Sequence, residues 1–414
     1  MILVRILYNF LLHLSWMVLH IVAIFNSKIN LFVRGRKHSE ALLKANPLAN
    51  QQVIWMHVAS LGEYEQGLPI LEKIRLTYPA HKIVLTFFSP SGYEVKKDKA
   101  EADLVLYLPM DTISNAKKFI NTLKPELAIF IKYEIWPNYL YELKQKNIPT
   151  LLASAIFSKR QVFFKWYGGF MRKSLKVFEH FFVQDQNSKR LLDSIGFTNT
   201  MVSGDTRFDR VSKIMEHNNQ LDFMDSFKGN SFCFVIGSSW PEDEKILIDY
   251  CNTSEASIKY VIAPHNIKQS HIEELKSSIT KKSICYSDIE GAKLPDFEVL
   301  IVDTIGLLTK IYSYADVAHV GGGFATGLHN TLEPATFGIP VIIGPKYDGF
   351  KEAEDLVEQN GIHVVHNKLE FKNLMNGFVS DDNFRKTTGT INSAYVNENK
   401  GATSLIFEHI KTFL

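Results

Sequence analysis

Short, nearly continuous apolar runs alternate with segments of helical periodicity from Gln52 onward. The first series of runs is VIWMHVAS, KIVLTFFS, ADLVLYLP, ELAIFIKYE, TLLASAIF, FFVQD and TMVSGD. After the polar stretch HNNQLDFMDSFKGN, the second series is SFCFVIGSS, KYVIAPH, EVLIVDT, VAHVGGG, PVIIGP and IHVVH. Apolar strands separated by helices are typical of parallel sheets that helices cover on both faces. The pattern therefore predicts the α/β class, with two Rossmann-like, doubly wound domains.

The same pattern divides the chain into five parts. We expect an N-terminal apolar segment with a basic flank at 1–37, a first domain at 38–217, a linker at 218–230, a second domain at 231–403 and a C-terminal helix at 404–414. In doubly wound sheets, ligands bind beyond the carboxyl ends of the strands. Residues that follow strands are therefore the first candidates for a functional site.

The N-terminal segment, ILVRILYNFLLHLSWMVLHIVAIF, is apolar for almost the length of a bilayer span. Polar residues interrupt it and a basic cluster follows it, namely Arg5, Asn9, His13 and His20, and then Lys28, Arg34, Arg36 and Lys37. Basic residues beside such a segment stay on the cytoplasmic side and attract anionic headgroups. We therefore expect a cytoplasmic body held at the membrane, by a helix that either spans the bilayer or lies in its interface. The alternative is an amphipathic helix that packs on a soluble body.

A glycine-rich stretch lies in the second series, in YADVAHVGGGFATGLHNTLEPATFGIPVIIGP. We expect a strand that ends at Val320, a turn containing Gly322 and Gly323, and a short helix that Asn330 opens. Glycines let a ligand approach the backbone, and a helix start favours a phosphate. The stretch therefore predicts a nucleotide site within reach of Glu333, and a tight turn in an α/β core is the alternative.

Two carboxylates follow strands of the first series. Glu63 comes after VIWMHVAS with Ser60 and Gly62 beside it, and Glu134 comes after ELAIFIK. A glutamate at the positive end of a helix stays ionised and can accept a proton. Two such residues at one edge of a sheet can face the same site, which favours acid–base chemistry. The alternatives are helix capping by Glu63 and an ordinary acidic residue at a helix start for Glu134.

Other polar groups also follow strands. Ser238 and Ser239 follow one strand, His265 follows the next, and Arg207 closes the first series. Their hydroxyl, imidazole and guanidinium groups could hold phosphate or sugar oxygens. Ordinary turn chemistry and a surface arginine are the alternatives.

Composition narrows the functional classes. The 46 basic and 44 acidic residues give a formal net charge of +2, which provides no global attraction for nucleic acid, so we expect no nucleic-acid partner. Cys233, Cys251 and Cys285 form no CxxC pair, which fits a reducing compartment. Because no DxD-type pair stands out in the loops, we expect neither a metal nor a cofactor.

Together the motifs carry a family likeness. The runs HVASLGEYEQGLPIL, YLPMDTISNAKKFINTLKPELAIFIKYEIWPN, SGDTRFD, IVDTIGLLTKIYSYADVAHVGGGF and GLHNTLEPATFGIPVIIGP resemble the 3-deoxy-D-manno-octulosonic acid (Kdo) transferases of lipopolysaccharide and lipid A synthesis. The resemblance covers nearly the whole chain. It implies the GT-B glycosyltransferase fold, in which an acceptor domain and a nucleotide-sugar donor domain face a cleft. It also implies an inverting transfer from CMP-Kdo to a lipid A precursor, lipid IVA, at the cytoplasmic face of the inner cell membrane.

The resemblance also assigns roles to residues. It implies that Glu63 is the catalytic base and that Glu134 is the second acidic residue of the family's E-x-E-x-W-P-N motif. The implied donor-binding residues are Ser238, Ser239, His265, Gly322, Gly323, Asn330, Glu333 and Arg207, and the implied acceptor-side residues are Ser60 and Gly62.

Three positions depart from the family's pattern. Lys132 stands where the first glutamate of E-x-E is expected, and no arginine separates Pro264 from His265. Arg207 replaces a typical lysine, which keeps the charge. These departures concern the phosphate and sugar contacts more than the class of activity.

Other functions are compatible with the same residues. They include a GT-B transferase or an epimerase that acts on a UDP- or GDP-sugar, and a catalytically silent, membrane-tethered nucleotide-binding protein. A diphosphate calls for more cationic groups than the glycine-rich stretch contains, and the two carboxylates at strand ends favour catalysis. The motifs are shared by family members that add one Kdo residue and by those that add several.

Overall fold

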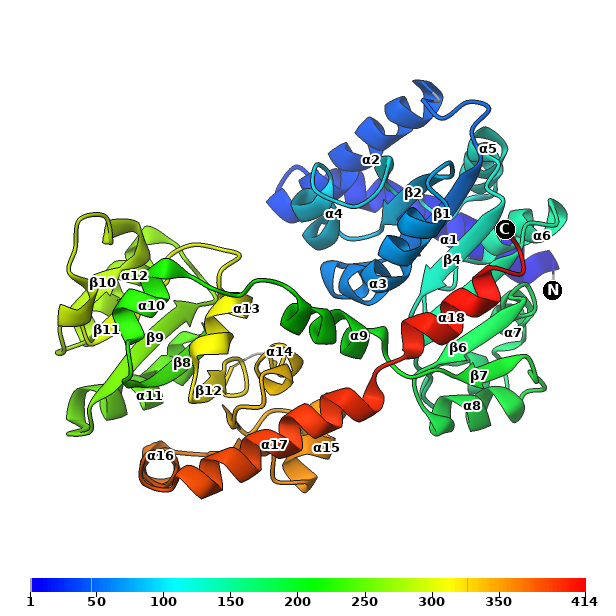
Figure 1. The fold of residues 1–414 in the computed structure, drawn as a ribbon. Helices are drawn as coiled ribbons and strands as arrows, with labels where there is room; N and C mark the ends of the chain where they lie inside the picture. The colour runs from blue at the N-terminus through cyan, green and yellow to red at the C-terminus, as the bar shows by residue number, and fades with distance from the viewer. Residues whose placement is uncertain (1, 46, 326) are drawn as a thin grey trace. The chain divides into compact units, whose positions relative to one another are not determined.

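The computed structural model describes residues 2–45, 47–325 and 327–414. Met1 of the predicted N-terminal segment and Thr326 of the glycine-rich stretch lie outside the described residues. The chain forms two compact units (Figure 1). Unit 1 runs to Arg210 and includes Lys400–Leu414, and unit 2 is Val211–Asn399. We describe each unit by itself.

Both units are built on a parallel sheet of seven strands within the described part of the chain. In unit 1 the order is β3-β2-β1-β4-β5-β6-β7, and in unit 2 it is β10-β11-β9-β8-β12-β13-β14. The strands of unit 1 are β1 Val53–Val58, β2 Lys82–Phe87, β3 Leu104–Tyr107, β4 Leu127–Ile131, β5 Thr150–Ala155, β6 His180–Val183 and β7 Thr200–Val202. The strands of unit 2 are β8 Phe232–Ser239, β9 Ile258–Pro264, β10 Ser283–Cys285, β11 Val299–Ile301, β12 Val317–Val320, β13 Val341–Ile343 and β14 Ile362–Val364.

Helices cover both faces of each sheet, as the apolar strands require. Those of unit 1 are α1 Ile2–Val22, α2 Ser27–Ala45, α3 Leu61–Thr77, α4 Pro90–Lys96, α5 Ile113–Leu123, α6 Pro137–Gln145, α7 Gly169–Leu175, α8 Gln186–Asp193 and α18 Ala402–Ile410, with α9 Thr206–Ser212 leading into unit 2. Those of unit 2 are α10 Asp222–Lys228, α11 Pro241–Thr253, α12 Gln269–Ser278, α13 Leu308–Ile311, α14 Leu332–Thr336, α15 Lys351–Glu358, α16 Lys368–Ser380 and α17 Asp382–Asn399. Short 3₁₀ turns are η1 Val162–Phe164, η2 Lys213–Glu216, η3 Tyr286–Asp288, η4 Leu294–Asp296 and η5 Tyr312–Tyr314.

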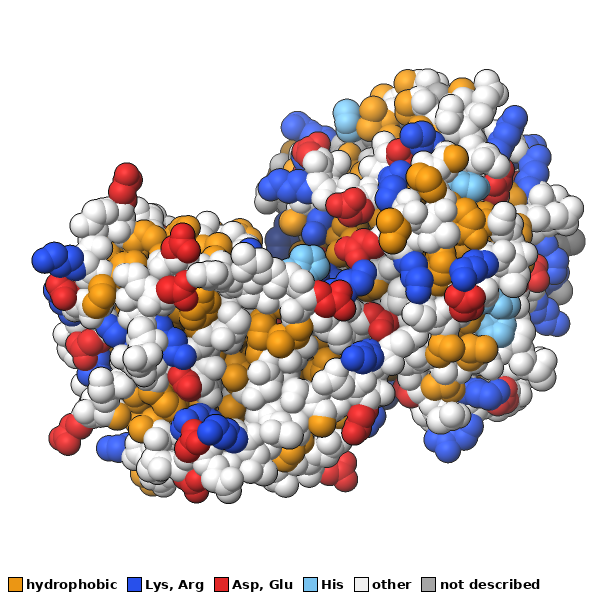
Figure 2. All heavy atoms as spheres, viewed as in Figure 1, with side chains coloured by type: hydrophobic (Ala, Val, Ile, Leu, Met, Phe, Trp, Pro, Cys, Tyr) orange, Lys and Arg blue, Asp and Glu red, His pale blue; other side chains and the backbone are white. Residues whose placement is uncertain are grey.

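Alternate side chains of each central strand supply the two cores. In unit 1, Trp55 packs in the core under α5 to α8, whereas Met56 packs in the core under α3, α4 and α18. In unit 2, α11, α12 and α16 cover one face. The three cysteines are free and buried. On the visible face of each unit, basic and acidic side chains are interspersed (Figure 2).

The predicted strands are confirmed, and one strand was missed. Strand β10, Ser283–Cys285, lies at the edge of its sheet and has only three residues. Other three-residue strands, such as β13, stand in longer apolar runs, whereas Ser283–Cys285 stands among Lys281, Lys282, Ser287 and Asp288 and therefore shows no apolar run. The predicted linker 218–230 contains helix α10, and the units divide after Arg210 rather than near residue 217.

One predicted helix start was wrong. Helix α14 begins at Leu332 and not at Asn330. The Asn330 side chain instead accepts a hydrogen bond from the Leu332 N–H group, at 3.1 Å, so Asn330 forms a turn ahead of the helix. The helix has five residues and ends at Thr336.

The N-terminal segment forms a helical hairpin on unit 1. Helix α1 is long and apolar enough to cross a membrane by length and composition, and the window from Leu3 to Val22 is not buried. Helix α2 returns alongside it. We expected the basic cluster to contact lipid headgroups, and for Arg36 that prediction was wrong. Arg36 is buried, and its guanidinium donates a hydrogen bond to the Phe88 carbonyl oxygen at 2.9 Å.

Candidate active site

The candidate residues of each unit lie where the order of its sheet reverses. In unit 1 the neighbouring strands β1 and β4 lead into Glu63 and Glu134. In unit 2 the neighbouring strands β8 and β12 lead into Ser239 and the glycine turn 321–323. Chains connected in opposite directions leave a crevice at this point, which is where doubly wound sheets bind ligands.

Glu63 is a buried carboxylate in the first turn of α3. Its side chain is 6% exposed, and one carboxylate oxygen accepts a hydrogen bond from the Ala59 N–H group. Burial, and after it the charge of Glu134, raises the pKa of Glu63 to about 7, although the N–H groups of Ala59 and Ser60 and the Lys132 ammonium work to lower it. A carboxylate whose pKa lies near neutrality is suited to accept a proton. The alternative capping role is also real, since Glu63 satisfies a backbone donor before the helix.

Glu134 belongs to a buried polar network. The Trp136 Nε1–H group lies 3.0 Å from both Glu134 Oε2 and His57 Nε2, and His57 Nε2 lies 3.3 Å from Glu134 Oε2. On its other side, His57 Nδ1 lies 2.8 Å from the Thr86 hydroxyl oxygen. These contacts hold Glu134 in one place, so its charge acts on Glu63 from a fixed position.

The backbone at the end of β4 is strained. Lys132 has a φ of 69°, in the left-handed region that a residue with a side chain rarely adopts. Such strain concentrates at functional sites. The conformation of Lys132 turns the chain directly after the strand, between the buried residues Ile131 and Glu134.

Ser60 and Gly62 flank the start of α3. Ser60 is the N-cap residue, yet its side chain makes no capping hydrogen bond. A Cβ atom on Gly62 would meet only the Ser60 Oγ atom, at 4.0 Å. The surface beside Glu63 therefore remains open at Gly62, which is compatible with the predicted acceptor side.

The glycine turn of unit 2 is required by packing. A Cβ atom on Gly321 would meet the Ser238 oxygen at 2.3 Å, and one on Gly323 would meet the Gly344 nitrogen at 2.7 Å. Gly322 has a φ of 96° and donates its N–H group to Asp243 Oδ2 at 3.0 Å. Close approach of chain segments, rather than ligand access alone, explains these glycines.

Asp243 holds this turn from the first turn of α11. Its Oδ2 atom also accepts the Trp240 N–H group at 2.8 Å, and its Oδ1 atom lies 3.5 Å from Nε2 of the wholly buried His319. Although burial works to raise it, the pKa of Asp243 is lowered by His319 and by the N–H groups of Gly322 and Trp240. Asp243 therefore stays ionised and structural.

Aromatic rings line the same end of the unit 2 sheet. The Trp240 ring stacks on His265 with centroids 4.5 Å apart, and His265 lies 4.6 Å from His329. Trp240 donates its Nε1–H group to His329 Nε2 at 3.0 Å. Flat rings of this kind can pack against a base or a sugar face.

The remaining predicted donor residues have protein partners. Glu333 accepts hydrogen bonds from the Thr309 hydroxyl at 2.8 Å and from the Asn330 amide at 3.1 Å. Ser239 donates to Glu244 at 2.9 Å, and Ser238 is strained, with a φ of 54°. In unit 1, Arg207 pairs with Asp205, with 2.8 Å between Nη2 and Oδ2.

Sequence reasoning missed three supporting residues, namely His57, Asp243 and His319. The sequence could have indicated His57 and His319, because a histidine inside a strand that is predicted to be buried on both faces needs a polar partner. Asp243 follows a proline that opens a helix, a position typical of capping residues. Its contact with the glycine turn needed the tertiary structure. Within the described residues, no cluster of three or more histidine, cysteine or acidic side chains could hold a metal ion.

Comparison with known proteins bears on the whole arrangement. Residues 34–210 match the family model described as 3-deoxy-D-manno-octulosonic-acid transferase, or Kdo transferase. This segment, which is most of unit 1, belongs to the Kdo transferase family. The match includes Glu63 and Glu134, so the family pattern coincides with the crevice of unit 1.

Relatives in the family extend the likeness to both units. The 3-deoxy-D-manno-octulosonic acid transferase of Aquifex aeolicus is 28% identical over 74% of this chain and 80% of its own length. The enzyme of the same name from Haemophilus influenzae is 25% identical over 88% of this chain and 87% of its own length.

Solved structures share the fold of this chain. UDP-GlcNAc 2-epimerase from Neisseria meningitidis, solved with UDP-GlcNAc, has a TM-score of 0.62 at 14% identity and covers 87% of this chain and 100% of its own. MurG from Acinetobacter baumannii has a TM-score of 0.55 at 12% identity and covers 87% of this chain and 99% of its own. The likeness concerns the fold alone, and the predicted GT-B class is confirmed.

Proposed function

We propose that this chain is an inverting glycosyltransferase that moves Kdo from CMP-Kdo to a lipid A precursor, lipid IVA, in lipopolysaccharide synthesis. The observation that carries the proposal is the carboxylate of Glu63, whose pKa burial raises to about 7, within the segment that matches the family model. A general base works best when its pKa lies near the working pH.

In the proposed reaction, Glu63 removes the proton from an acceptor sugar hydroxyl. The hydroxyl oxygen forms a bond to the anomeric carbon of Kdo as the bond to the CMP phosphate breaks, and the proton stays on Glu63. Burial, and after it the charge of Glu134, makes Glu63 more basic than an ordinary glutamate. The open surface at Gly62 and Ser60 supports an acceptor position beside that base.

Unit 2 holds the donor in this proposal. The N–H groups of Gly321 and Gly322 already donate to Gly237 and Asp243, and the Ser239 hydroxyl donates to Glu244. We therefore assign the donor phosphate to the Gly323 N–H group and the Ser238 hydroxyl, with Ser239 holding the end of the strand. Glu333, which Asn330 and Thr309 orient, is the candidate for the ribose or base. His265 supplies a flat ring beside Trp240.

We propose that the transfer uses neither a metal nor a cofactor. Hydrogen-bond donors at the phosphate and a nearby cation can stabilise the departing negative charge. Arg207 is the candidate cation from unit 1, and its pairing with Asp205 holds the guanidinium in one orientation.

We further propose that the catalytic units are cytoplasmic and work at the inner membrane. The exposed, apolar helix α1 supports this location, as do the exposed basic residues Lys28, Arg34 and Lys37 that follow it. An enzyme anchored where its lipid acceptor resides meets that acceptor at a high effective concentration.

Transfer of Kdo to lipid IVA in detergent, read by mass spectrometry, tests this function. We expect one or more Kdo additions with CMP-Kdo and none with UDP- or GDP-sugars. Thermal unfolding gives an independent reading, because a selective ligand stabilises the fold. We expect CMP to raise the melting temperature more than UDP or GDP. A larger rise with UDP, together with an absence of Kdo transfer, would reject the proposal in favour of an enzyme that uses a UDP-sugar.

A further inference from the structure

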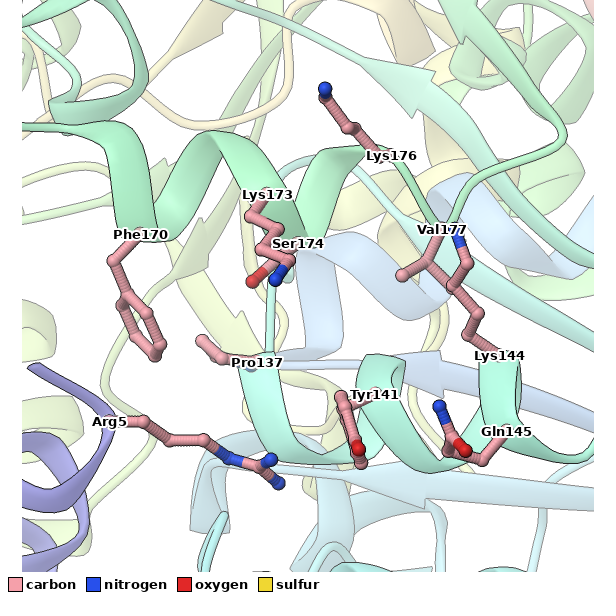
Figure 3. A pocket seen from close by; sticks show the side chains of 10 residues that line it. All are labelled: Arg5, Pro137, Tyr141, Lys144, Gln145, Phe170, Lys173, Ser174, Lys176 and Val177. Carbon is pink, nitrogen blue, oxygen red and sulfur yellow. The ribbon is translucent and has the colours of Figure 1, made fainter. Parts of the chain in front are cut away.

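A basic pocket lies in unit 1 between α1, α6 and α7, with a volume of about 440 Å³. Three cationic side chains line it, namely Arg5, Lys144 and Lys173, together with the rings of Tyr141 and Phe170, and Lys176 lies at its edge. Figure 3 shows Arg5 reaching from α1 toward Tyr141, Lys144 extending from α6 toward Val177, and Lys176 pointing to the other side of α7. The volume is in the range of sites that hold small ligands.

The pocket's positive charge is poorly compensated. No acidic residue lines it, and among the described residues no carboxylate lies within ion-pair distance of Lys144, Lys173 or Lys176. Arg5 donates its Nε–H group to the Asn138 side chain at 3.1 Å and stacks 4.0 Å above the Tyr141 ring. Arg5 also interacts with the charge of the buried Asp111, which does not line the pocket. Cations kept together without counter-charges favour an anionic ligand.

Helix α1 is held against unit 1 by its polar side. Tyr8 donates its hydroxyl to Asp111 at 2.8 Å, and Asn9 accepts a hydrogen bond from the Asn138 amide at 3.1 Å. Asp111 and Asn138 are both buried. A helix fixed by these contacts lies along the domain surface and cannot cross a bilayer while they persist.

The other side of α1 is apolar and exposed, next to the pocket. Leu3 and Phe10 are 79% and 62% exposed, and Ile6 and Leu7 are also exposed. Trp166, directly ahead of α7, is 91% exposed. Tryptophan is enriched at membrane interfaces, and an amphipathic helix that lies in the interface buries its apolar face among acyl chains.

We propose that the basic pocket binds the headgroup phosphate of an anionic phospholipid while the exposed face of α1 rests among that lipid's acyl chains. The pocket and α1 then form one docking surface, with Arg5 contributing to both. The charge of the pocket selects a phosphate, and the adjoining apolar surface selects a lipid over a free anion. This inference rests on the proposed function only in placing the chain at a membrane.

Sedimentation of the full-length protein with vesicles tests the inference without any need for transfer activity. One set of vesicles contains phosphatidylcholine alone, and the other contains phosphatidylcholine mixed with phosphatidylglycerol. We expect the parent protein to bind the mixed vesicles more tightly, and Lys144→Gln/Lys173→Gln to weaken that binding about tenfold or more, because each basic residue near an anionic surface contributes strongly. Lys144→Arg/Lys173→Arg should retain binding.

A matched control removes the same charge from another part of unit 1. Lys73 lies on α3 and Lys411 follows α18, under the opposite face of the sheet from α6 and α7. We expect Lys73→Gln/Lys411→Gln to change vesicle binding by less than about twofold, since distant charges are screened. Equal losses in the two double variants, or no loss in either, would overturn the proposal. Thermal unfolding checks that each variant is folded.

A second arm distinguishes a bilayer lipid from the acceptor itself. Kdo transfer is measured in detergent that contains lipid IVA and no phospholipid. We expect the KM for lipid IVA to be unchanged in Lys144→Gln/Lys173→Gln. A raised KM with normal vesicle binding would assign the pocket to the acceptor and overturn the inference. If the parent lacks transfer activity, the proposed function fails while the vesicle result still stands.

Discussion

Glu63 of unit 1 and Asp243 of unit 2 occupy corresponding places and have opposite properties. Each is buried in the first turn of a helix, α3 or α11, that follows a strand at the point where its sheet reverses order. Burial raises the pKa of Glu63 to about 7, whereas the pKa of Asp243 is lowered despite its burial. The fold alone therefore does not decide which carboxylate is reactive.

The partners of each carboxylate make the difference. Asp243 has His319 and two backbone N–H groups, so its charge is compensated. The charge of Glu63 is also stabilised, by the N–H groups of Ala59 and Ser60 and by Lys132, but burial and the charge of a second carboxylate, Glu134, outweigh these contacts. We infer that unit 1 carries the chemistry and that unit 2 uses its carboxylate to hold a binding loop. Substitutions in the two units should therefore have different effects.

The largest expected effect is on transfer by Glu63→Gln. The amide keeps an oxygen for the Ala59 N–H group but cannot accept the acceptor's proton, so we expect kcat to fall by about 10²- to 10⁴-fold. The thermal stabilisation by CMP should be unchanged. Glu65→Gln, on the same helix and in surface ion pairs with Lys96 and Arg210, is the control and should remain active. Turnover in Glu63→Gln close to that of the parent would exclude Glu63 as the base.

The next effect is a loss of stability in Asp243→Asn. Asn removes the charge that faces the N–H groups of Gly322 and Trp240, and weakening buried hydrogen bonds to a charged group costs about 1–3 kcal/mol and loosens the turn at Gly322. Because the folded-state pKa of Asp243 is lowered, its stabilising contribution is complete at pH 7 and is lost only in acid. Denaturant unfolding measures the loss. Asp249→Asn on the same helix, exposed and paired with Lys368, should cost less than about 1 kcal/mol, and an equal cost in both variants would contradict the structural role.

Glu63→Gln should change stability in the opposite direction. Since the folded-state pKa of Glu63 is raised, the parent loses stability as the pH rises from the ordinary glutamate value through about 7. We expect the variant to be more stable than the parent by on the order of 2 kcal/mol at pH 8 and by almost nothing at pH 4. Unfolding curves at the two pH values test this. A variant that is less stable than the parent at pH 8 would mean that neighbouring groups stabilise the charge of the Glu63 carboxylate, and would contradict this prediction.

The smallest effect concerns the pH profile of kcat/KM. We expect the activity of the parent to rise with pH with an apparent pKa near 7, as Glu63 ionises. Lys132→Met removes a cation that lowers the pKa of Glu63, so the profile should move to higher pH, with activity at pH 6 falling about threefold. Glu134→Gln should move the profile to lower pH. Profiles that move in the same direction in both variants would contradict the electrostatic coupling.

Much of the fold and of the site could be predicted from the sequence. The apolar strands, the two doubly wound units and the positions of Glu63 and Glu134 after β1 and β4 follow from local periodicity and chain order. These features depend on residues close together in the chain, which a linear pattern records. The missed strand β10 and the misplaced start of α14 are short elements, for which that pattern is weakest.

The tertiary structure decided what the candidate groups contact. Asp243 reaches Gly322 across 79 residues of chain, and Arg36 turns into the protein to meet Phe88, although its neighbours in the sequence suggest a headgroup contact. The pocket between α1, α6 and α7 brings Arg5 beside Tyr141 in the same way. The sequence by itself determined which residue types stand at the ends of the strands. Their burial and charged neighbours, which set whether a carboxylate is reactive or structural, arise only when distant segments pack together.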